Sequence, residues 1–201
     1  MLGLPKSTEL NKQLPKKAIF ATFQLSTAEK AKIDADIAKI SIVNEVSAAR
    51  LNIADGEKTK SFFVLLISLK KREFDEKTVV AISKLIDQNL LFILAYEGEA
   101  KLATHHLKLM QTEWRKIDEL SIELNGLNMD TVWENIIAQI GDIQVSKGTT
   151  LDEQIAINEQ RAKIEREIET LTKRSRAENQ PKKKFELAQK INKLRENLDK
   201  L

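Results

Sequence analysis

The C-terminal part of the chain, residues 151–201, carries leucine and isoleucine at alternating spacings of three and four. This spacing places one apolar seam along a helix, as the a and d positions of a coiled coil do. The pattern is broken once, at Asn179-Gln180-Pro181, because a proline cannot continue a helix. The tail is therefore predicted to form two amphipathic helices folded into a hairpin.

The seam of this hairpin indicates association rather than catalysis. The first arm is expected from about Leu151 to Lys173, with Arg161 interrupting its seam. The seam residues can hold the two arms together, and we expect part of the seam to stay exposed for a partner. The candidate partner-binding residues are Ile164, Ile168, Leu171, Leu187, Ile191, Leu194 and Leu198.

The remainder of the 201 residues is long enough for one globular domain. We expect an N-terminal arm over residues 1–17, an α+β domain over 18–147 and the helical hairpin over 148–201. In the arm, the polar stretch Lys6–Lys12 is predicted to form one short helix. Ser7 is its expected cap, and the helix should end before Pro15. The domain is expected to be a mixed β-sheet with helices packed on it.

Alternating and continuous apolar runs give the order of its elements. A capping box at Ser26–Glu29 predicts a helix from Thr27 to about Lys39. We expect a strand after this helix and then the buried central strand. A helix that begins at Asp75 should connect the central strand to a parallel neighbouring strand. Two further strands and a helix capped by Asn128 complete the prediction. The predicted strands cover residues 40–47, 62–67, 90–96, 100–110 and 114–124, and the last helix covers 129–140.

Composition excludes several classes of protein. The chain has no cysteine, so disulfides, cysteine zinc sites and thiol catalysis are excluded. No apolar run is long enough to span a bilayer, and the N-terminus lacks the apolar stretch of a signal peptide, so we expect a cytoplasmic protein without membrane contact. No cofactor is predicted. His105 and His106 are adjacent on a predicted strand and point to opposite faces, so no metal site is predicted either.

Two short patterns resemble catalytic or nucleotide-binding motifs. Glu99 and Lys101 have the E-x-K spacing of metal-dependent nucleases, in which a carboxylate holds a divalent ion and a lysine orients water. Charges at a hairpin edge also prevent edge-to-edge pairing, which is the simpler interpretation. Gly56-Glu57-Lys58-Thr59 is similar to the end of a phosphate-binding loop, but the glycine and lysine are not adjacent and an earlier glycine is missing.

Positive charge gathers at the predicted bend of the hairpin. Residues 159–201 contain 13 Lys and Arg against 8 Asp and Glu, although the whole chain is only +3. Such a cluster can contact nucleic-acid phosphates or simply be a solvated tip. The candidate nucleic-acid contacts are Arg174, Arg176, Lys182, Lys183 and Lys184.

Three segments carry a resemblance to a known family: Leu4–Thr8 with Pro15-Lys16, Leu91–Tyr96 with its hairpin, and Glu178–Leu187. Together they resemble a bacterial family of unknown function whose members are encoded beside a superfamily-two helicase and a DNA methyltransferase, in loci of the restriction or anti-phage defence type. The chain departs from the family pattern at Ala103–His106, where members tend to have a tyrosine and a lysine. The resemblance implies a small accessory subunit of DNA-processing enzymes and assigns no catalytic residue.

These observations favour a non-enzymatic assembly subunit that contacts a helicase, a methyltransferase or a second copy of itself through the hairpin. Two alternatives stay open. One is a metal-dependent nuclease that uses Glu99 and Lys101, and the other is direct DNA binding by the basic tip.

Overall fold

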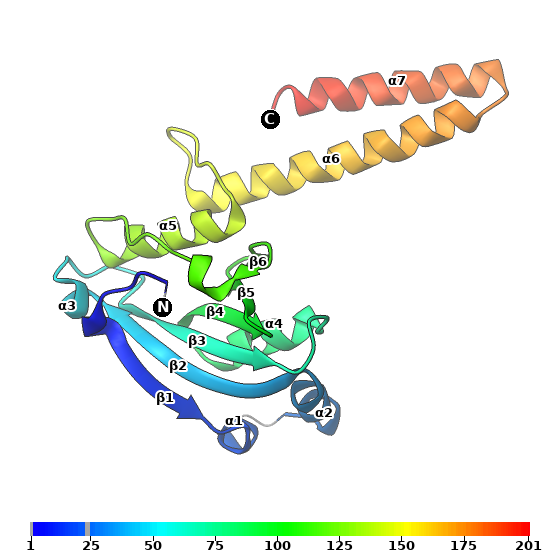
Figure 1. Ribbon diagram of the computed structural model, residues 1–201. Coiled ribbons are helices and arrows are strands. Elements are labelled where there is room, and N and C mark those ends of the chain that lie inside the picture. The colour runs from blue at the N-terminus through cyan, green and yellow to red at the C-terminus, as the bar shows by residue number, and fades with distance from the viewer. Residues whose placement is uncertain (1, 23–24) are drawn as a thin grey trace. The chain divides into compact units, whose positions relative to one another are not determined.

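A computed structural model describes residues 2–22 and 25–201 of the chain. It divides the chain into two compact units, Met1–Ile143 and Gln144–Leu201. The first unit is a mixed β-sheet with packed helices, and the second consists of two long helices (Figure 1). The protein therefore has the α+β class that the sequence predicted. No helix in the described residues combines the length and the apolar character needed to cross a membrane.

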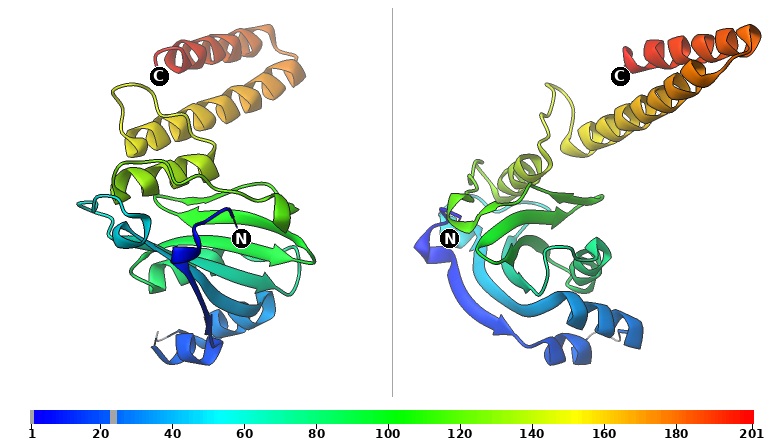
Figure 2. Two further views of the ribbon diagram at one scale, coloured as in Figure 1. Left: turned by 60° about the vertical axis from the view of Figure 1, so that its left-hand side comes forward. Right: turned by 45° about the vertical axis from the view of Figure 1, so that its right-hand side comes forward.

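The described part of the first unit contains a seven-stranded sheet in the order β1-β2-β3-β4-β5-β6, with β7 paired to β5. Strands β3 and β4 are parallel, and every other neighbouring pair is antiparallel. Strands β1 and β2 curve strongly at one side of the sheet (Figure 2). The strands are β1 Glu9–Leu14, β2 Ile37–Ser47, β3 Ser61–Leu69, β4 Asn89–Tyr96, β5 Glu99–His105, β6 Leu109–Gln111 and β7 Arg115–Lys116.

Several helices of this unit begin where the sequence predicted. Ser26 and Glu29 form the predicted capping box of α2, Asp75 caps α4, and Asn128 forms a capping box with Thr131 at the start of α5. Each cap satisfies backbone N–H groups that have no partner inside the helix. The helices are α1 Lys16–Thr22, α2 Thr27–Asp36, α3 Ala48–Leu51, α4 Glu76–Leu85 and α5 Met129–Gly141, with 3-10 turns at Lys6–Thr8 and Ile117–Glu119.

The core lies on both faces of the two parallel strands. On one face Leu65 and Phe92 belong to a buried cluster with Ile82 of α4. On the other face the ring of Phe62 lies 5.1 Å from the ring of Trp133 of α5, centroid to centroid. Because α4 and α5 cover opposite faces, the strands between them read as continuous apolar runs.

A buried carboxylate joins the ends of three elements at one edge of this core. Asp36, the last residue of α2, is 3% exposed and accepts a 3.0 Å hydrogen bond from the backbone N–H of Asp75. The ammonium group of Lys71 lies 3.0 Å from the same carboxylate. Burial raises the pKa of Asp36, but these donors and the Thr78 hydroxyl outweigh burial and hold the pKa below its ordinary value.

The N-terminal prediction was wrong. The segment expected to form a short helix, Lys6–Lys12, consists of one 3-10 turn followed by strand β1. Lys12 and Leu14 pair with Ile42 and Ile40 of β2, so residues expected in an arm form the edge of the sheet. Pairing with a strand distant in the sequence outweighed the local helix signal.

Three other predicted elements have different bounds. The helix predicted to end at Lys39 ends at Asp36, because β2 already begins at Ile37. The predicted strand 100–110 is two strands, β5 and β6, separated by a turn in which Leu107 is 59% exposed. The predicted strand 114–124 contains only β7 and a 3-10 turn, although Leu120 and Ile122 are buried as expected.

Candidate functional site

The second unit is the predicted helical hairpin. Helix α6, Leu151–Ala177, and helix α7, Pro181–Leu198, run side by side in opposite directions (Figures 1 and 2). Thr150 caps α6 in a capping box with Glu153, and Pro181 occupies the first turn of α7, where its missing N–H costs no helical hydrogen bond. The bend at residues 178–180 lies at the predicted break.

The predicted seam is the least exposed face of this hairpin. Ile191 is buried, with 8% of its surface exposed, whereas most residues on the other faces of α7 are exposed. The alternation of three and four keeps the seam residues on the sides where the two helices pack. The other predicted partner-binding residues are only half-buried: Ile164, Ile168, Leu171, Leu187, Leu194 and Leu198.

Two helices alone therefore cover their apolar seam incompletely. In the interior of a folded domain, residues such as leucine and isoleucine are usually fully buried. Six of the seven predicted residues keep part of their surface open to solvent. A third helix with an apolar stripe could cover this remaining surface, which is how helical bundles are completed.

One exposed residue of the hairpin was missed by sequence reasoning. Phe185 of α7 is 65% exposed and lies outside the three-and-four alternation of the seam. It directly follows Lys182-Lys183-Lys184, so an aromatic ring stands beside the basic run. An aromatic residue out of register with an apolar seam was the signal that could have identified it.

The predicted basic tip is exposed, and its charges are mixed. All five candidate nucleic-acid contacts have exposed side chains: Arg174, Arg176, Lys182, Lys183 and Lys184. Arg174 and Lys183, from different arms, line one hollow of about 490 Å³ together with Lys190. Glu178 and Glu186 line the same hollow, so the hollow itself is not uniformly positive.

Glu99 and Lys101, the predicted nuclease pair, lie on strand β5 in different environments. The carboxylate of Glu99 lies 2.8 Å from the guanidinium of Arg72. Lys101 is only 9% exposed, and its ammonium group lies 5.0 Å from the ring centroid of Phe74 and 5.4 Å from that of Trp114. Burial lowers the pKa of Lys101, and the nearby carboxylates of Glu76 and Glu113 partly oppose this shift.

This arrangement is that of a packed cation rather than of a metal site. Arg72 also lies over the Trp114 ring, at 5.3 Å, so two cations contact one indole. Across the part of the chain that the structure describes, no group of three or more His, Cys, Asp or Glu side chains could hold a metal ion. Two carboxylates outside strand β5 have other roles: Asp75 caps α4 and pairs with Lys32, and Asp87 lines a separate cavity.

The two histidines lie at the end of strand β5. His105 is its last residue and half-buried, and His106 begins the turn that follows. Burial lowers the pKa of His105, and the charges of Lys84 and His106 lower it further. This shift favours the neutral form of the His105 imidazole.

Comparison with known proteins identifies the family but not the activity. Residues 2–198 match the model of a domain of unknown function, DUF4391, and the chain belongs to this family. Searches of curated proteins and of solved structures found no match. The family match extends over both units, so the hairpin and the sheet are parts of the same family domain.

Proposed function

We propose that this protein is a non-enzymatic accessory subunit that binds a helical segment of a protein partner through its C-terminal hairpin. The observation that carries the proposal is the half-buried seam, in which only Ile191 of the seven predicted contact residues is buried. A partner helix with its own apolar stripe would bury the rest, and burial of apolar surface drives most protein association.

The partner we propose is a DNA-processing enzyme, a helicase or a methyltransferase. The support is the family resemblance, which implies a location beside such enzymes in defence-type loci. The excess of Lys and Arg in residues 159–201 also favours a partner whose docking surface is acidic, because complementary charge speeds encounter and selects orientation. A second copy of the chain is the competing occupant, and the experiment below separates the two.

The experiment captures candidate partners on the immobilised full-length chain. Leu194→Asp and Leu198→Asp place a charge in the half-buried seam, and each should abolish capture because a carboxylate would then be buried without a partner. Asn192→Asp adds the same charge at an exposed position of the same helix and should capture normally. Light scattering on each variant reports whether the chain pairs with itself.

Ile191 differs from Leu194 and Leu198 in its burial. Because it is buried within the hairpin, Ile191→Asp should separate the two arms as well as prevent capture. Circular dichroism distinguishes these effects, since the Leu198→Asp variant should keep its helix content. Capture that survives Leu194→Asp and Leu198→Asp at parental strength contradicts the proposed surface.

A second candidate function is contact of the hairpin tip with single-stranded nucleic acid. Its specific support is Phe185, an exposed ring beside three lysines, because proteins that bind single strands combine phosphate contacts with base stacking. Replacing Lys182, Lys183 and Lys184 by Gln should weaken binding and reduce its salt dependence, and Phe185→Ala should weaken it at all salt concentrations. Unchanged binding in both variants would refute this placement.

The nuclease hypothesis has no comparable support, because Glu99 pairs with Arg72 and the ammonium group of Lys101 packs against the rings of Phe74 and Trp114. It is still directly testable. Cleavage of plasmid DNA with magnesium or manganese that disappears in Glu99→Ala would establish it, and absence of cleavage with both ions would count against it.

A further inference from the structure

A basic cavity lies within the first unit, at the C-terminal end of helix α4. Its volume is about 490 Å³, in the range of about 300 to 1,000 Å³ that is usual for small-molecule sites. The walls come from the loop before β3, the end of α4, the start of β4 and the end of β5. The lining residues with charged side chains or an imidazole are Lys58, Lys60, Lys84, Asp87 and His105.

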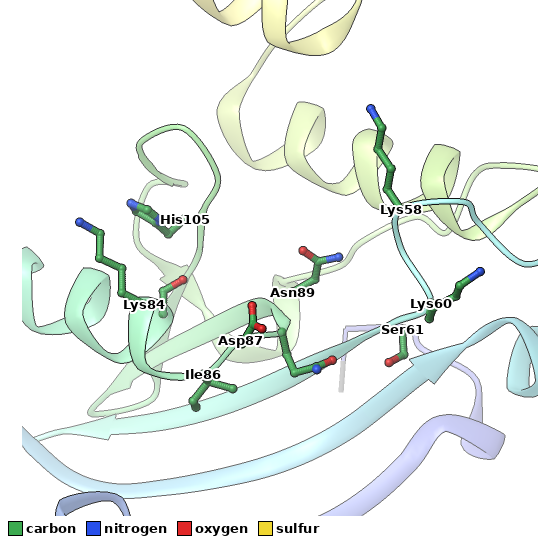
Figure 3. Close-up of a pocket in the computed structure, with 10 residues that line it drawn as sticks. Lys58, Lys60, Ser61, Lys84, Ile86, Asp87, Asn89 and His105 are labelled. Atoms are coloured by element: carbon green, nitrogen blue, oxygen red, sulfur yellow. The ribbon is translucent and has the colours of Figure 1, made fainter. Parts of the chain in front are cut away.

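The cations stand on two sides of this cavity, with polar groups between them. Figure 3 shows Lys84 and His105 on one side and Lys58 and Lys60 on the other. Three lysines line the cavity with a single carboxylate, that of Asp87, and the ammonium group of Lys60 donates a 2.6 Å hydrogen bond to the Gly56 carbonyl. Within the described residues, Lys58 and Lys84 form no ion pair, so their charges are available to an anion.

The loop that carries Lys58 and Lys60 is held in place by a carboxylate of helix α5. The carboxylate of Asp130, in the first turn of α5, accepts hydrogen bonds from the backbone N–H groups of Glu57, Lys58 and Thr59 at 2.7, 3.1 and 2.6 Å. Three successive N–H groups around one carboxylate form an anion nest, and the protein's own side chain fills it.

Two further contacts fix this loop. Any side chain at Gly56 would collide with Asp130, because a Cβ there would lie 2.5 Å from a carboxylate oxygen. Asn89, at the start of β4, donates a 3.3 Å hydrogen bond to the Thr59 hydroxyl. The motif that is similar to a phosphate-binding loop therefore holds no external phosphate in its nest and instead supports two lysines at the cavity.

The remaining lining groups define what else a ligand must carry. Asp87, Gln88 and Asn89 offer carboxylate and amide oxygens, and Ser61 and Ser83 offer hydroxyls. The last carbonyls of α4 also lie at this end of the helix, where they act as hydrogen-bond acceptors. A ligand that satisfies these acceptors needs hydroxyl or amino donors besides its anionic group, and among the described residues no Phe, Tyr or Trp side chain lines the cavity to stack on a base.

We propose that this cavity binds a phosphate ester of a hydroxylated carbon skeleton. Lys58 and Lys84 reach the ligand from opposite sides of the cavity, one of these ammonium groups contacting the phosphate, and the hydroxyls bond to Asp87 and Asn89 between them. A free sugar phosphate and the ribose phosphate of a nucleotide share this chemistry. The proposal is independent of the hairpin and of any partner bound there.

Calorimetric titration of the full-length protein tests this site with four probes: ribose 5-phosphate, AMP, ribose and inorganic phosphate. We expect saturable binding of ribose 5-phosphate, AMP or both, and at least tenfold weaker binding of ribose and of inorganic phosphate, which each supply only half of the contacts. Binding of both esters identifies the sugar phosphate as the recognised group, and binding of AMP alone identifies a nucleotide.

Three single variants connect the binding to the cavity. Lys58→Ala and Lys84→Ala should each weaken binding about tenfold, because each removes a charge-assisted hydrogen bond. Lys77→Ala removes an exposed lysine from the opposite end of α4 and should bind like the parent. Circular dichroism verifies that all three variants are folded. The proposal is overturned if neither ester binds, if ribose or inorganic phosphate binds as tightly as the esters, or if Lys58→Ala and Lys84→Ala both bind like the parent.

Discussion

The two units of this protein differ in how completely they cover their apolar residues. In the first unit, Phe62, Leu91 and Phe92 have no exposed surface, because helices cover both faces of the central strands. In the second unit, two helices pack against each other. The first two turns of α6 contain buried residues, but along the rest of the hairpin one seam residue is buried, Ile191. A sheet with helices on both faces closes its own core, whereas this two-helix hairpin leaves part of its apolar seam exposed.

The largest effect should come from the closed core. Phe92→Ala removes a fully buried ring and should cost the first unit about 3 to 5 kcal/mol of unfolding free energy. Trp114 and Trp133 are the only tryptophans and both lie in this unit, so tryptophan fluorescence during urea unfolding reports on it alone. Leu194→Ala in the hairpin is the matched control and should leave the fluorescence transition in place. Equal shifts in the two variants would mean that the units unfold as one.

A smaller effect should come from the internal anion nest. Asp130→Asn keeps one acceptor oxygen but removes the charge that three N–H groups surround, and should cost about 1 to 3 kcal/mol. Asp142→Asn makes the same chemical change at an exposed position just after α5 and should change the urea midpoint little. A parental midpoint in Asp130→Asn would show that the nest contributes nothing to stability.

Acid should distinguish the two units. Burial raises the pKa of Asp36 and of Asp130, yet their hydrogen-bond donors outweigh it and hold both pKa values below the ordinary value. A carboxylate with a depressed pKa stabilises the folded state above its unfolded pKa, and this contribution is lost as pH falls through the folded pKa. The first unit should therefore lose stability below about pH 4.

The hairpin has weaker linkage to acid. The pKa of Glu153 is lowered by the Thr150 N–H and hydroxyl, and the pKa of Glu169 by Lys173, but both carboxylates are exposed and solvent screens them. Urea unfolding should be measured at several pH values between pH 7 and pH 3, once by tryptophan fluorescence and once by circular dichroism. The midpoint from fluorescence should fall more steeply with decreasing pH than the midpoint from circular dichroism. The Asp36→Asn variant should flatten the fluorescence dependence, and an unchanged slope would remove Asp36 from the explanation.

Local signals in the sequence were enough for elements whose ends are fixed by neighbouring residues. The capping residues Ser26, Asp75 and Asn128 each start the predicted helix, and the apolar runs around Leu65 and Phe92 are the predicted parallel strands. The break before Pro181 likewise ends the first arm of the hairpin within a few residues of its predicted end.

Features that depend on distant residues could not be predicted in this way. Strand β1 forms because its residues pair with β2. The nest at Glu57–Thr59 is filled by the carboxylate of Asp130, which lies more than 70 positions later in the sequence. The cavity at Lys84 and His105 also joins four separate segments. Phe185 is the exception, because its position outside the seam was visible in the sequence.

Hydrogen exchange of the full-length protein, resolved by segment, tests the central claim most directly. If the hairpin seam is incompletely covered, amides of α6 and α7 should exchange through local opening, much faster than those of β3 and β4, which should exchange only when the first unit unfolds. Equally slow exchange in both units would contradict the account, because it would show that the seam is already fully covered in the protein alone.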